Sequence, residues 1–134
     1  MTPFPLKIVT PDGIRFEGQA EELIVRTTTG DMGILAGHIN CVAALGMGRA
    51  TVILEGKKEY GACIGGMVSV LDGQVMLVPT SFEWSKDIDV SRAEASYQKA
   101  RQILENKSST DTDLRLAEAR LRRALVRKGV ASSK

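Results

Sequence analysis

Glycine and proline become scarce near residue 88, and this change limits what the chain can fold into. Of the 13 glycines, 12 precede residue 88, and so do all four prolines. The interior of a helix excludes both residue types, whereas turns between strands use them. We therefore expect a turn-rich segment, residues 1–87, followed by a segment suited to helices, residues 88–134.

Charge divides at the same position. Residues 1–87 carry 7 basic and 10 acidic side chains, whereas residues 88–134 carry 11 and 6, so the net charge of +2 conceals two unlike parts. No apolar run approaches the roughly 18 residues of a membrane span. The first residues also lack the basic start and apolar core of a signal peptide. These observations predict a soluble protein made in the cytoplasm.

The first segment alternates apolar and polar residues over short runs, which is typical of strands with one buried face. Asp72-Gly73 is the clearest hairpin signal, because a two-residue turn needs positive φ. We interpret residues 30–33 as a turn, since the Lys-Ser/Thr of a phosphate-binding loop does not follow. The spacing predicts an all-β sandwich or barrel. The predicted strands are residues 4–10, 14–16, 20–27, 50–55, 59–64, 67–71 and 74–79.

The same segment offers little for catalysis. A nucleophile needs a base and an orienting group, but His38 is the only histidine, and we expect it to be a loop or packing residue. Cys41 and Cys63 lie in apolar surroundings without Cys-x-x-Cys spacing, so we expect two small buried side chains and no zinc site or disulfide framework. The predicted β-domain is therefore a docking body.

After residue 88 the apolar residues recur at alternating steps of three and four, which predicts helices that pack along a seam. Polar, capping-type residues at 106–112 indicate a loop between two helices. We expect an antiparallel helical hairpin, weakly held because an alanine-rich seam buries little area. The seam residues are Val90, Ala93, Tyr97, Ala100 and Leu104, followed by Leu114, Ala117, Leu121 and Ala124.

The start of the first helix admits two interpretations. Ser91 and Glu94 have the spacing of a capping box, and Asp87 or Asp89 could cap the helix instead. Alternatively, Asp89 and Arg92 lie one turn apart and could hold a small polar ligand between the two domains. From the residues alone, helix capping is the preferred interpretation.

The second helix concentrates arginine. Five arginines occupy 13 residues with Glu118 as the only acid among them, so few pairs within the helix can relieve their repulsion. Arginine binds phosphate and carboxylate with paired donors. We therefore expect an anionic partner, which could be an acidic protein surface, a nucleotide or nucleic acid. At 100° per residue, one flank of the seam carries Arg120, Arg123 and Arg127, and the other carries Arg115 and Arg122.

Three motifs occur in an order and spacing that resemble a known family. They are Thr10-Pro11-Asp12-Gly13, Gly33-Ile34-Leu35 followed by Gly37-His38, and Ile88-Asp89-x-x-Arg92-Ala93 at the head of the hairpin. Over essentially the whole chain they resemble the epsilon subunit of bacterial F-type ATP synthase, in the version of Bacillus-like bacteria. Ala36 departs from the family, which often has proline there, and we expect only a softer turn.

The resemblance implies a β-sandwich of about ten strands in residues 1–87 and a regulatory two-helix hairpin in residues 88–134. It implies a non-catalytic rotor subunit that docks on the gamma subunit and the c-ring, peripheral to the cytoplasmic face of the plasma membrane and not inserted in it. The hairpin would either fold against the sandwich or extend along gamma toward the alpha and beta catalytic subunits, inhibiting ATP hydrolysis. The five arginines of the second helix would then form an inhibitory basic face.

In this version of the family, the Ile-Asp-x-x-Arg-Ala motif belongs to an ATP site. The resemblance thus implies ATP as a regulatory ligand that binds the folded hairpin, and leaves open whether Mg²⁺ accompanies its phosphates. Asp89 would face the adenine amino group or orient Arg92, while Lys99 is a weaker phosphate candidate. Ile88 and Ala93 would line an apolar base pocket. The complete expected ATP site is Glu83, Ile88, Asp89, Arg92, Ala93, Arg123 and Arg127.

Two other functional classes compete with this interpretation. A small nucleic-acid-binding module would explain the basic helix, but aromatic residues make up only 4% of the chain, so bases would find few stacking platforms. A small enzyme is the other alternative, and the missing catalytic constellation argues against it. We therefore expect neither a nucleic-acid partner nor catalytic activity of the chain by itself.

Overall fold

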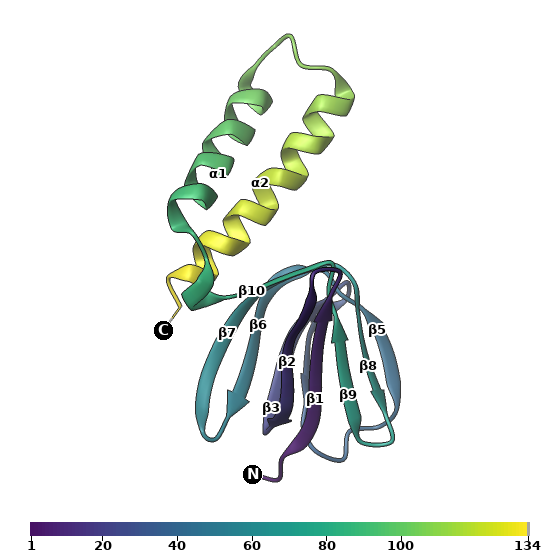
Figure 1. Ribbon diagram of the computed structural model, residues 1–134. Coiled ribbons are helices and arrows are strands. Elements are labelled where there is room, and N and C mark those ends of the chain that lie inside the picture. Colours follow the sequence, from purple (N-terminus) through teal and green to yellow (C-terminus); the bar gives the residue numbers. More distant parts are fainter. Residues whose placement is uncertain (134) are drawn as a thin grey trace.

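A β-sandwich and a helical hairpin that stands beyond one of its ends make up the structure, a computed structural model that describes residues 1–133 (Figure 1). In chain order the strands are β1 (Phe4–Thr10), β2 (Gly13–Ala20), β3 (Glu22–Thr27), β4 (Gly30–Ile34), β5 (Cys41–Ala44), β6 (Met47–Leu54), β7 (Lys57–Ile64), β8 (Met67–Leu71), β9 (Gln74–Val78) and β10 (Ser81–Trp84). A short 3₁₀ turn, η1 (Ser85–Asp87), leads into the helices α1 (Val90–Glu105) and α2 (Asp111–Ala131). The predicted sandwich followed by a two-helix hairpin is confirmed.

Two five-stranded sheets form the sandwich, in the orders β2-β1-β9-β8-β5 and β10-β7-β6-β3-β4. Neighbouring strands pair antiparallel except β1 and β9, which run parallel with Leu6 opposite Val75. Alternate residues of β1 face the space between the sheets, where Leu6 and Ile8 are buried against residues such as Leu23 of the other sheet. This alternation is the period-two pattern by which the strands were predicted.

Two strand predictions need correction. Residues 30–33 are not a turn, because they belong to β4 and pair with β3. Residues 20–27 are not one strand either: β2 ends at Ala20 in one sheet and β3 begins at Glu22 in the other. The crossing between sheets falls at this fully buried alanine. Pattern alone also missed β5 and β10, although the resemblance implied the right number of strands.

The predicted hairpin turn at Asp72-Gly73 is confirmed. Both residues have positive φ, 50° and 82°, and join β8 to β9. Glu55 and Gly56 form the equivalent turn between β6 and β7, with φ of 51° and 78°. A glutamate is an unusual first residue for such a turn, which is why composition did not point to it.

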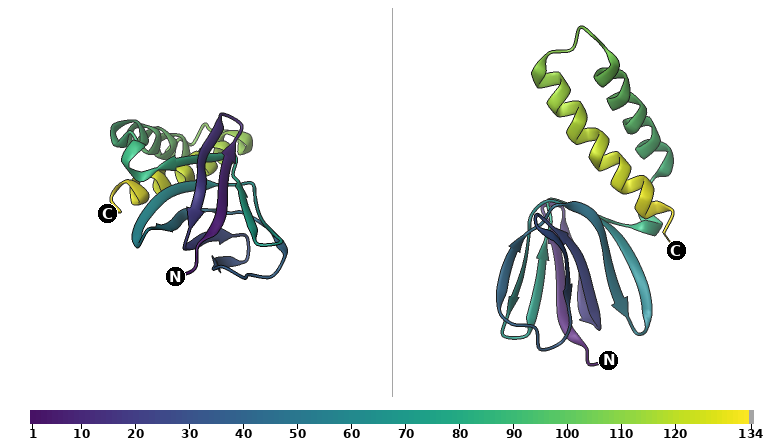
Figure 2. Two further views of the ribbon diagram at one scale, coloured as in Figure 1. Left: turned by 60° about the horizontal axis from the view of Figure 1, so that its bottom comes forward. Right: turned by 180° about the vertical axis from the view of Figure 1, so that it is seen from behind.

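The helices α1 and α2 lie antiparallel and side by side in every view (Figures 1 and 2). Their seam is made of alanines: Ala93, Ala100, Ala117 and Ala124 are all at most 4% exposed. Val90 was predicted to belong to the seam, and this prediction is wrong, because Val90 is the first residue of α1 and is 56% exposed. Small side chains permit close approach but bury little apolar area, so a weakly held seam stays a prediction.

Both helices begin with a side-chain cap. At the start of α1 the Asp89 carboxylate accepts a hydrogen bond of 3.0 Å from the Arg92 backbone N–H, so Asp89 is the cap and the Ser91–Glu94 box is not used. In α2, Thr110 and Asp113 form a reciprocal capping box, so the helix starts at Asp111 and the loop is shorter than predicted. These caps satisfy backbone N–H groups that have no partner within the helix.

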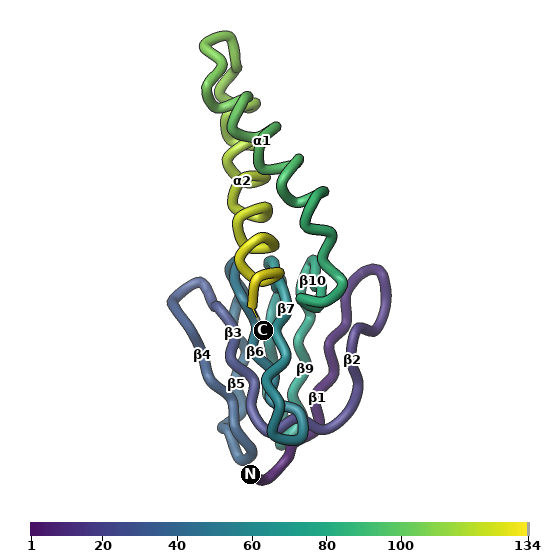
Figure 3. Tube along the Cα trace, turned by 90° about the vertical axis from the view of Figure 1, so that its left-hand side faces the viewer, coloured from purple at the N-terminus to yellow at the C-terminus, as the bar shows by residue number. Residues whose placement is uncertain are grey.

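The last turns of α2 attach the hairpin to the sandwich, where they lie over β6 and β7 (Figure 3). Val130, Ala62 and Ile88 form a small buried cluster there. Tyr60 and Val126 pack against its edge. The joint therefore combines the end of α2, the strand β7 and Ile88, which lies two positions before the start of α1.

Candidate functional site

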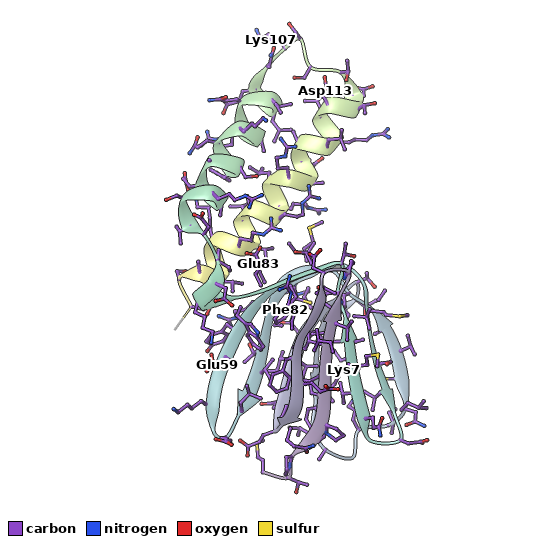
Figure 4. All side chains as sticks on the ribbon, viewed as in Figure 1. Lys7, Glu59, Phe82, Glu83, Lys107 and Asp113 are labelled. Atoms are coloured by element: carbon purple, nitrogen blue, oxygen red, sulfur yellow. The ribbon has the colours of Figure 1, made fainter. Side chains whose placement is uncertain are left out.

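A cleft of about 720 Å³ lies between the sandwich and the hairpin. Its walls are the turn between β1 and β2, strand β10, the η1 turn, the first two turns of α1 and one flank of α2. Figure 4 shows Glu83 of β10 at this junction, beneath the hairpin. The cleft is thus built from segments that are far apart in the chain.

Every residue expected in the ATP site lines this cleft. Glu83 comes from β10, four residues come from the start of α1 and the segment before it, and two come from α2. These seven residues are Glu83, Ile88, Asp89, Arg92, Ala93, Arg123 and Arg127. Lys99 does not line the cleft, so it is the one phosphate candidate that the fold leaves outside.

Several lining residues were not expected from the sequence. Arg120 shares its flank of α2 with Arg123 and Arg127, and this periodicity was the available signal for it. Trp84 and Arg15 carried no such signal, because only the fold of the sandwich brings β10 and the β1–β2 turn to the hairpin. The additional lining residues are Asp12, Ile14, Arg15, Ser81, Phe82, Trp84, Asp87, Ser96 and Arg120.

One ion pair crosses the cleft from hairpin to sandwich. Arg127 Nε donates to Glu83 Oε1 at 2.8 Å, and its Nη2 donates to Ser81 Oγ at 3.4 Å. Both partners are partly buried, with side-chain exposures of 26% for Arg127 and 36% for Glu83. Partial burial with two hydrogen bonds makes this pair stronger than an ordinary surface salt bridge.

Three other guanidinium groups in the cleft have no acidic partner within residues 1–133. They are those of Arg92, Arg120 and Arg123, whereas Arg15 lies 3.7 Å from Asp12. Of the acids near them, Asp89 is occupied in part by capping α1. Unpaired guanidinium groups in a concave, partly desolvated site attract anions and present planar paired donors to phosphate oxygens.

Apolar residues also line the cleft near the sandwich. Ile88 and Ala93 are buried there, with exposures of 8% and 4%. The indole of Trp84 packs edge-on against Phe82, with ring centroids 4.9 Å apart, and its Nε1 donates to the Arg15 carbonyl at 3.3 Å. The cleft therefore offers apolar surface near the sandwich and positive charge along the helices.

A second cluster joins α1 to α2 around Lys128. Its Nζ lies 2.5 Å from the Glu94 carboxylate and 4.2 Å from the centre of the Tyr97 ring. A hydrogen bond from Gln98, together with Lys128, lowers the pKa of Glu94. Lys128 is not among the residues that line the cleft, so this cluster closes the base of the hairpin without contributing to the cleft.

The remaining candidates for chemistry lie away from the cleft. His38 is in the loop between β4 and β5, as predicted, with Nδ1 2.8 Å from the Ile39 carbonyl oxygen. Cys63 is buried and its burial raises the thiol pKa to about 12, whereas Cys41 is only partly buried, contrary to expectation. Over residues 1–133, no cluster of three or more His, Cys, Asp or Glu side chains could bind a metal ion. None of the helices in that range is long and apolar enough to cross a membrane.

The five arginines of α2 do not share one surface. Arg120, Arg123 and Arg127 line the cleft, while Arg122 lines a separate groove beside Arg26 and Leu125. Arg115 is exposed toward the far end of the hairpin. An inhibitory basic face made of all five would therefore require α2 to leave its present position.

Comparison with known proteins covers both parts of the chain. Residues 3–85 match the model of the ATP synthase delta/epsilon chain beta-sandwich domain, and residues 86–131 match that of its long alpha-helix domain. An ATP synthase epsilon chain from Ruminococcus albus is 41% identical over 135 residues, covering 100% of both chains. One from Bacillus velezensis is 40% identical over 133 residues, covering 99% of this chain and 100% of its own.

Two solved structures share the fold. A chain in the Euglena gracilis mitochondrial ATP synthase, in a structure of OSCP, F1 and the c-ring, superposes with a TM-score of 0.83 at 24% identity, covering 96% of this chain and 81% of that one. A chain in the central stalk and c-ring of the Tetrahymena thermophila mitochondrial ATP synthase gives a TM-score of 0.62 at 12% identity, covering 96% of each.

Proposed function

The chain belongs to the epsilon subunit family of F-type ATP synthases, and from this premise we propose that it is a non-catalytic rotor subunit whose hairpin regulates ATP hydrolysis. The sandwich docks on the gamma subunit and the c-ring, as a central-stalk position requires. The complex is associated with the membrane, and this subunit is peripheral to it on the cytoplasmic side. The hairpin, when extended, reaches the alpha and beta catalytic subunits.

The observation that carries the regulatory part is the cleft, which has unpaired guanidinium groups along the helices and apolar residues near the sandwich. A nucleotide has the same division, because its base is flat and weakly polar and its phosphates are anionic. Ile88 and Ala93 would flank the base, and Arg92 and Arg123 would hold phosphate oxygens. Asp89 uses one carboxylate oxygen as the cap, and the other would accept from the adenine amino group.

Glu83 and Arg127 have a different part in this proposal. Their ion pair of 2.8 Å orients the Arg127 guanidinium at the floor of the cleft. The ligand would then meet a donor group that is already positioned, which lowers the entropic cost of binding. Mg²⁺ would arrive with the phosphates, because the described residues provide no carboxylate cluster to hold it independently.

ATP bound in this cleft would stabilise the folded hairpin, because the walls belong to the sandwich and to both helices. At roughly ten times its dissociation constant, a ligand stabilises the form that it binds by about 1.4 kcal/mol. The alanine seam provides little opposing stability, so an effect of this size is enough to shift the population of the hairpin. ATP acts here as a signal and is not hydrolysed by this subunit.

Loss of ATP would release the hairpin and expose the arginines of α2. Together with Arg115 and Arg122, the three cleft arginines would then face acidic surfaces of the catalytic subunits. Electrostatic attraction of this kind would hold the extended hairpin in place and block rotation in the direction of hydrolysis. The same guanidinium groups therefore serve the nucleotide in one state and the catalytic subunits in the other.

Titration of the isolated protein with ATP by calorimetry tests the site. We expect weaker ATP binding in Asp89→Ala and in Arg92→Ala. A third variant, Asp89→Ser, separates the role of Asp89 as helix cap from its role as a contact to the base, because serine keeps the cap but cannot reach the base. Lys107→Ala, in the loop at the far end of the hairpin, is the control. ATP affinity equal to wild type in Asp89→Ser and Arg92→Ala would exclude these residues from the site.

Removal of residues 88–134 tests the regulatory role in the assembled enzyme. The truncated subunit retains the sandwich, so the complex should still form, and its ATP hydrolysis should exceed that of the wild type at low ATP concentration. Hydrolysis no higher than in the wild type would contradict the inhibitory role of the hairpin.

A further inference from the structure

Arg120 lines the cleft beside Arg123 and Arg127, although no motif pointed to it as a ligand-binding residue. It is partly buried, and it makes no ion pair within residues 1–133. A partly desolvated guanidinium group without a counter-charge is unfavourable in the free protein and is relieved by an anionic ligand. This position in the cleft separates Arg120 from Arg115 and Arg122, the two arginines of α2 that lie outside it.

The three cleft arginines form a row along α2. Arg127 follows Arg120 by seven positions, which corresponds to two turns and about 10 Å along the helix axis. Arg127 stands at the sandwich end, where Glu83 and Ser81 bind it. Arg120 therefore stands at the outer end of the row, opposite α1, which contributes Ser96 to the same cleft.

The apolar part of the cleft is at the other end. Ile88, Ala93 and Trp84 are close to the sandwich, where they suit a base. An elongated ligand whose base lies there must direct its phosphates outward between the helices. Its last phosphate is then the group nearest to Arg120.

We propose that Arg120 is a further ligand-binding residue of the cleft, which contacts the terminal phosphate of a nucleoside triphosphate. This inference depends on the proposed nucleotide site and adds to it a residue that distinguishes phosphate chains by length. A diphosphate or monophosphate bound by the same base contacts ends before it reaches Arg120. Arginine suits this task because its planar group donates two parallel hydrogen bonds to a phosphate.

Arg122 provides a matched control on the same helix. It has the same side chain two residues away, but it lines the separate groove beside Arg26 on another face of α2. In the isolated subunit there is no catalytic subunit for either arginine to bind, so the assay measures nucleotide contacts alone.

The test is calorimetric titration of the wild-type, Arg120→Gln and Arg122→Gln proteins with ATP, ADP and AMP. Because Arg120→Gln loses one charge-assisted contact, this variant should bind ATP roughly tenfold more weakly than the wild type, or weaker still. Binding of ADP and of AMP to Arg120→Gln should change by less than twofold, and Arg122→Gln should bind all three nucleotides as the wild type does. The single tryptophan, Trp84, lines the cleft, so its fluorescence gives an independent reading of the same affinities.

Three results would overturn the inference. If Arg120→Gln binds ATP as tightly as the wild type does, Arg120 is not a ligand-binding residue. If the substitution weakens the binding of ATP and of ADP by the same factor, the contact of Arg120 is not with the terminal phosphate of the triphosphate. If the wild-type protein binds none of the nucleotides, the proposed function itself fails, and that outcome is seen before any variant is compared.

Discussion

Val130 is the residue whose truncation tests most directly how the hairpin is held. Its side chain is 2% exposed and packs with Ala62 and Ile88 at the joint with the sandwich. Val130→Ala removes two carbon atoms, and at about 0.8 kcal/mol for each buried carbon the contact loses about 1.6 kcal/mol, before any term for the cavity. Since 1.4 kcal/mol is a factor of ten, the equilibrium for detaching the hairpin should shift about fifteenfold.

Native-state hydrogen exchange measures this equilibrium. A detached hairpin loses the packing that stabilises its short helices, which are marginal by themselves in water, so its amides exchange in proportion to the detached population. Amides in the last turns of α2 should exchange about fifteenfold faster in Val130→Ala than in the wild type. Those in β1 and β9 should keep their rates, since these strands lie within the sandwich core. The effect is thus expected in one part of the molecule only.

Val90→Ala is the matched control for this experiment. It makes the same substitution at a helical residue that is 56% exposed, and it corrects for the higher helix propensity of alanine. Exchange in α2 should not accelerate in this variant. If Val130→Ala leaves α2 unchanged, or if it accelerates the sandwich strands equally, then Val130 does not anchor a separately opening hairpin.

Three further predictions concern the seam, the sandwich and pH. Ala100→Leu places a larger side chain in a fully buried seam position and should destabilise the hairpin by about 1–3 kcal/mol. Calorimetry should find that this variant binds ATP more weakly than the control Ala95→Leu, whose site is exposed, and equal affinities of the two variants would contradict the prediction. Gly66→Ala should prevent stable folding, because the added Cβ would lie 2.0 Å from the Val78 carbonyl oxygen. The Cβ of Gly73→Ala meets no atom within 4 Å, so this variant should lose only about 1–2 kcal/mol of unfolding free energy to its positive φ. Thermal denaturation compares the two variants, and similar melting temperatures would refute the clash. The Cys63 thiol has a pKa near 9.0 when unfolded and about 12 in the folded protein, so its contribution to stability is complete below pH 9 and falls as pH rises above it. By pH 10.5 the loss should be about 2 kcal/mol, measured as the difference in unfolding free energy between wild type and Cys63→Ala, and a pH-independent difference would show that the thiol does not titrate this way.

The division into two architectures was predictable because glycine and proline exclude helices wherever they are frequent. The limits of β8 and the hairpin turn at Asp72-Gly73 followed from local alternation and from positive φ. The end of β2 was missed even though the alternation changes phase there, because Glu21 and Glu22 stand consecutively between the buried Ala20 and Leu23. Pairing with different partners confirms that this change of phase separates two strands.

Strand β4 was missed for a different reason. Its two glycines suggested a turn, yet Met32 and Ile34 point inward while Asp31 and Gly33 point outward. The apolar and polar alternation of a strand is therefore present in the sequence, but the two glycines favoured a turn instead. In the structure, hydrogen bonding to β3 supplies the stability that glycine residues do not supply by themselves.

The cleft residues were predictable to different degrees for a physical reason. The start of α1 forms a continuous motif, so resemblance located it, and helical periodicity related Arg120 to Arg123 and Arg127. Trp84 and Arg15 have no spacing relation to the hairpin in the chain. They meet it because β10 and the β1–β2 turn end at the same edge of the sandwich, which is a property of the topology.

The caps of the two helices have a consequence for how fast the hairpin can move. Asp89 caps α1 and Thr110 with Asp113 caps α2, and every one of these partners belongs to the hairpin itself. Neither helix depends on the sandwich to terminate its backbone hydrogen bonds. Detachment therefore breaks side-chain contacts only, and the activation barrier contains no term for melting and rebuilding a helical turn. Such a motion belongs with the microsecond-to-millisecond displacements of intact elements and not with slower local unfolding.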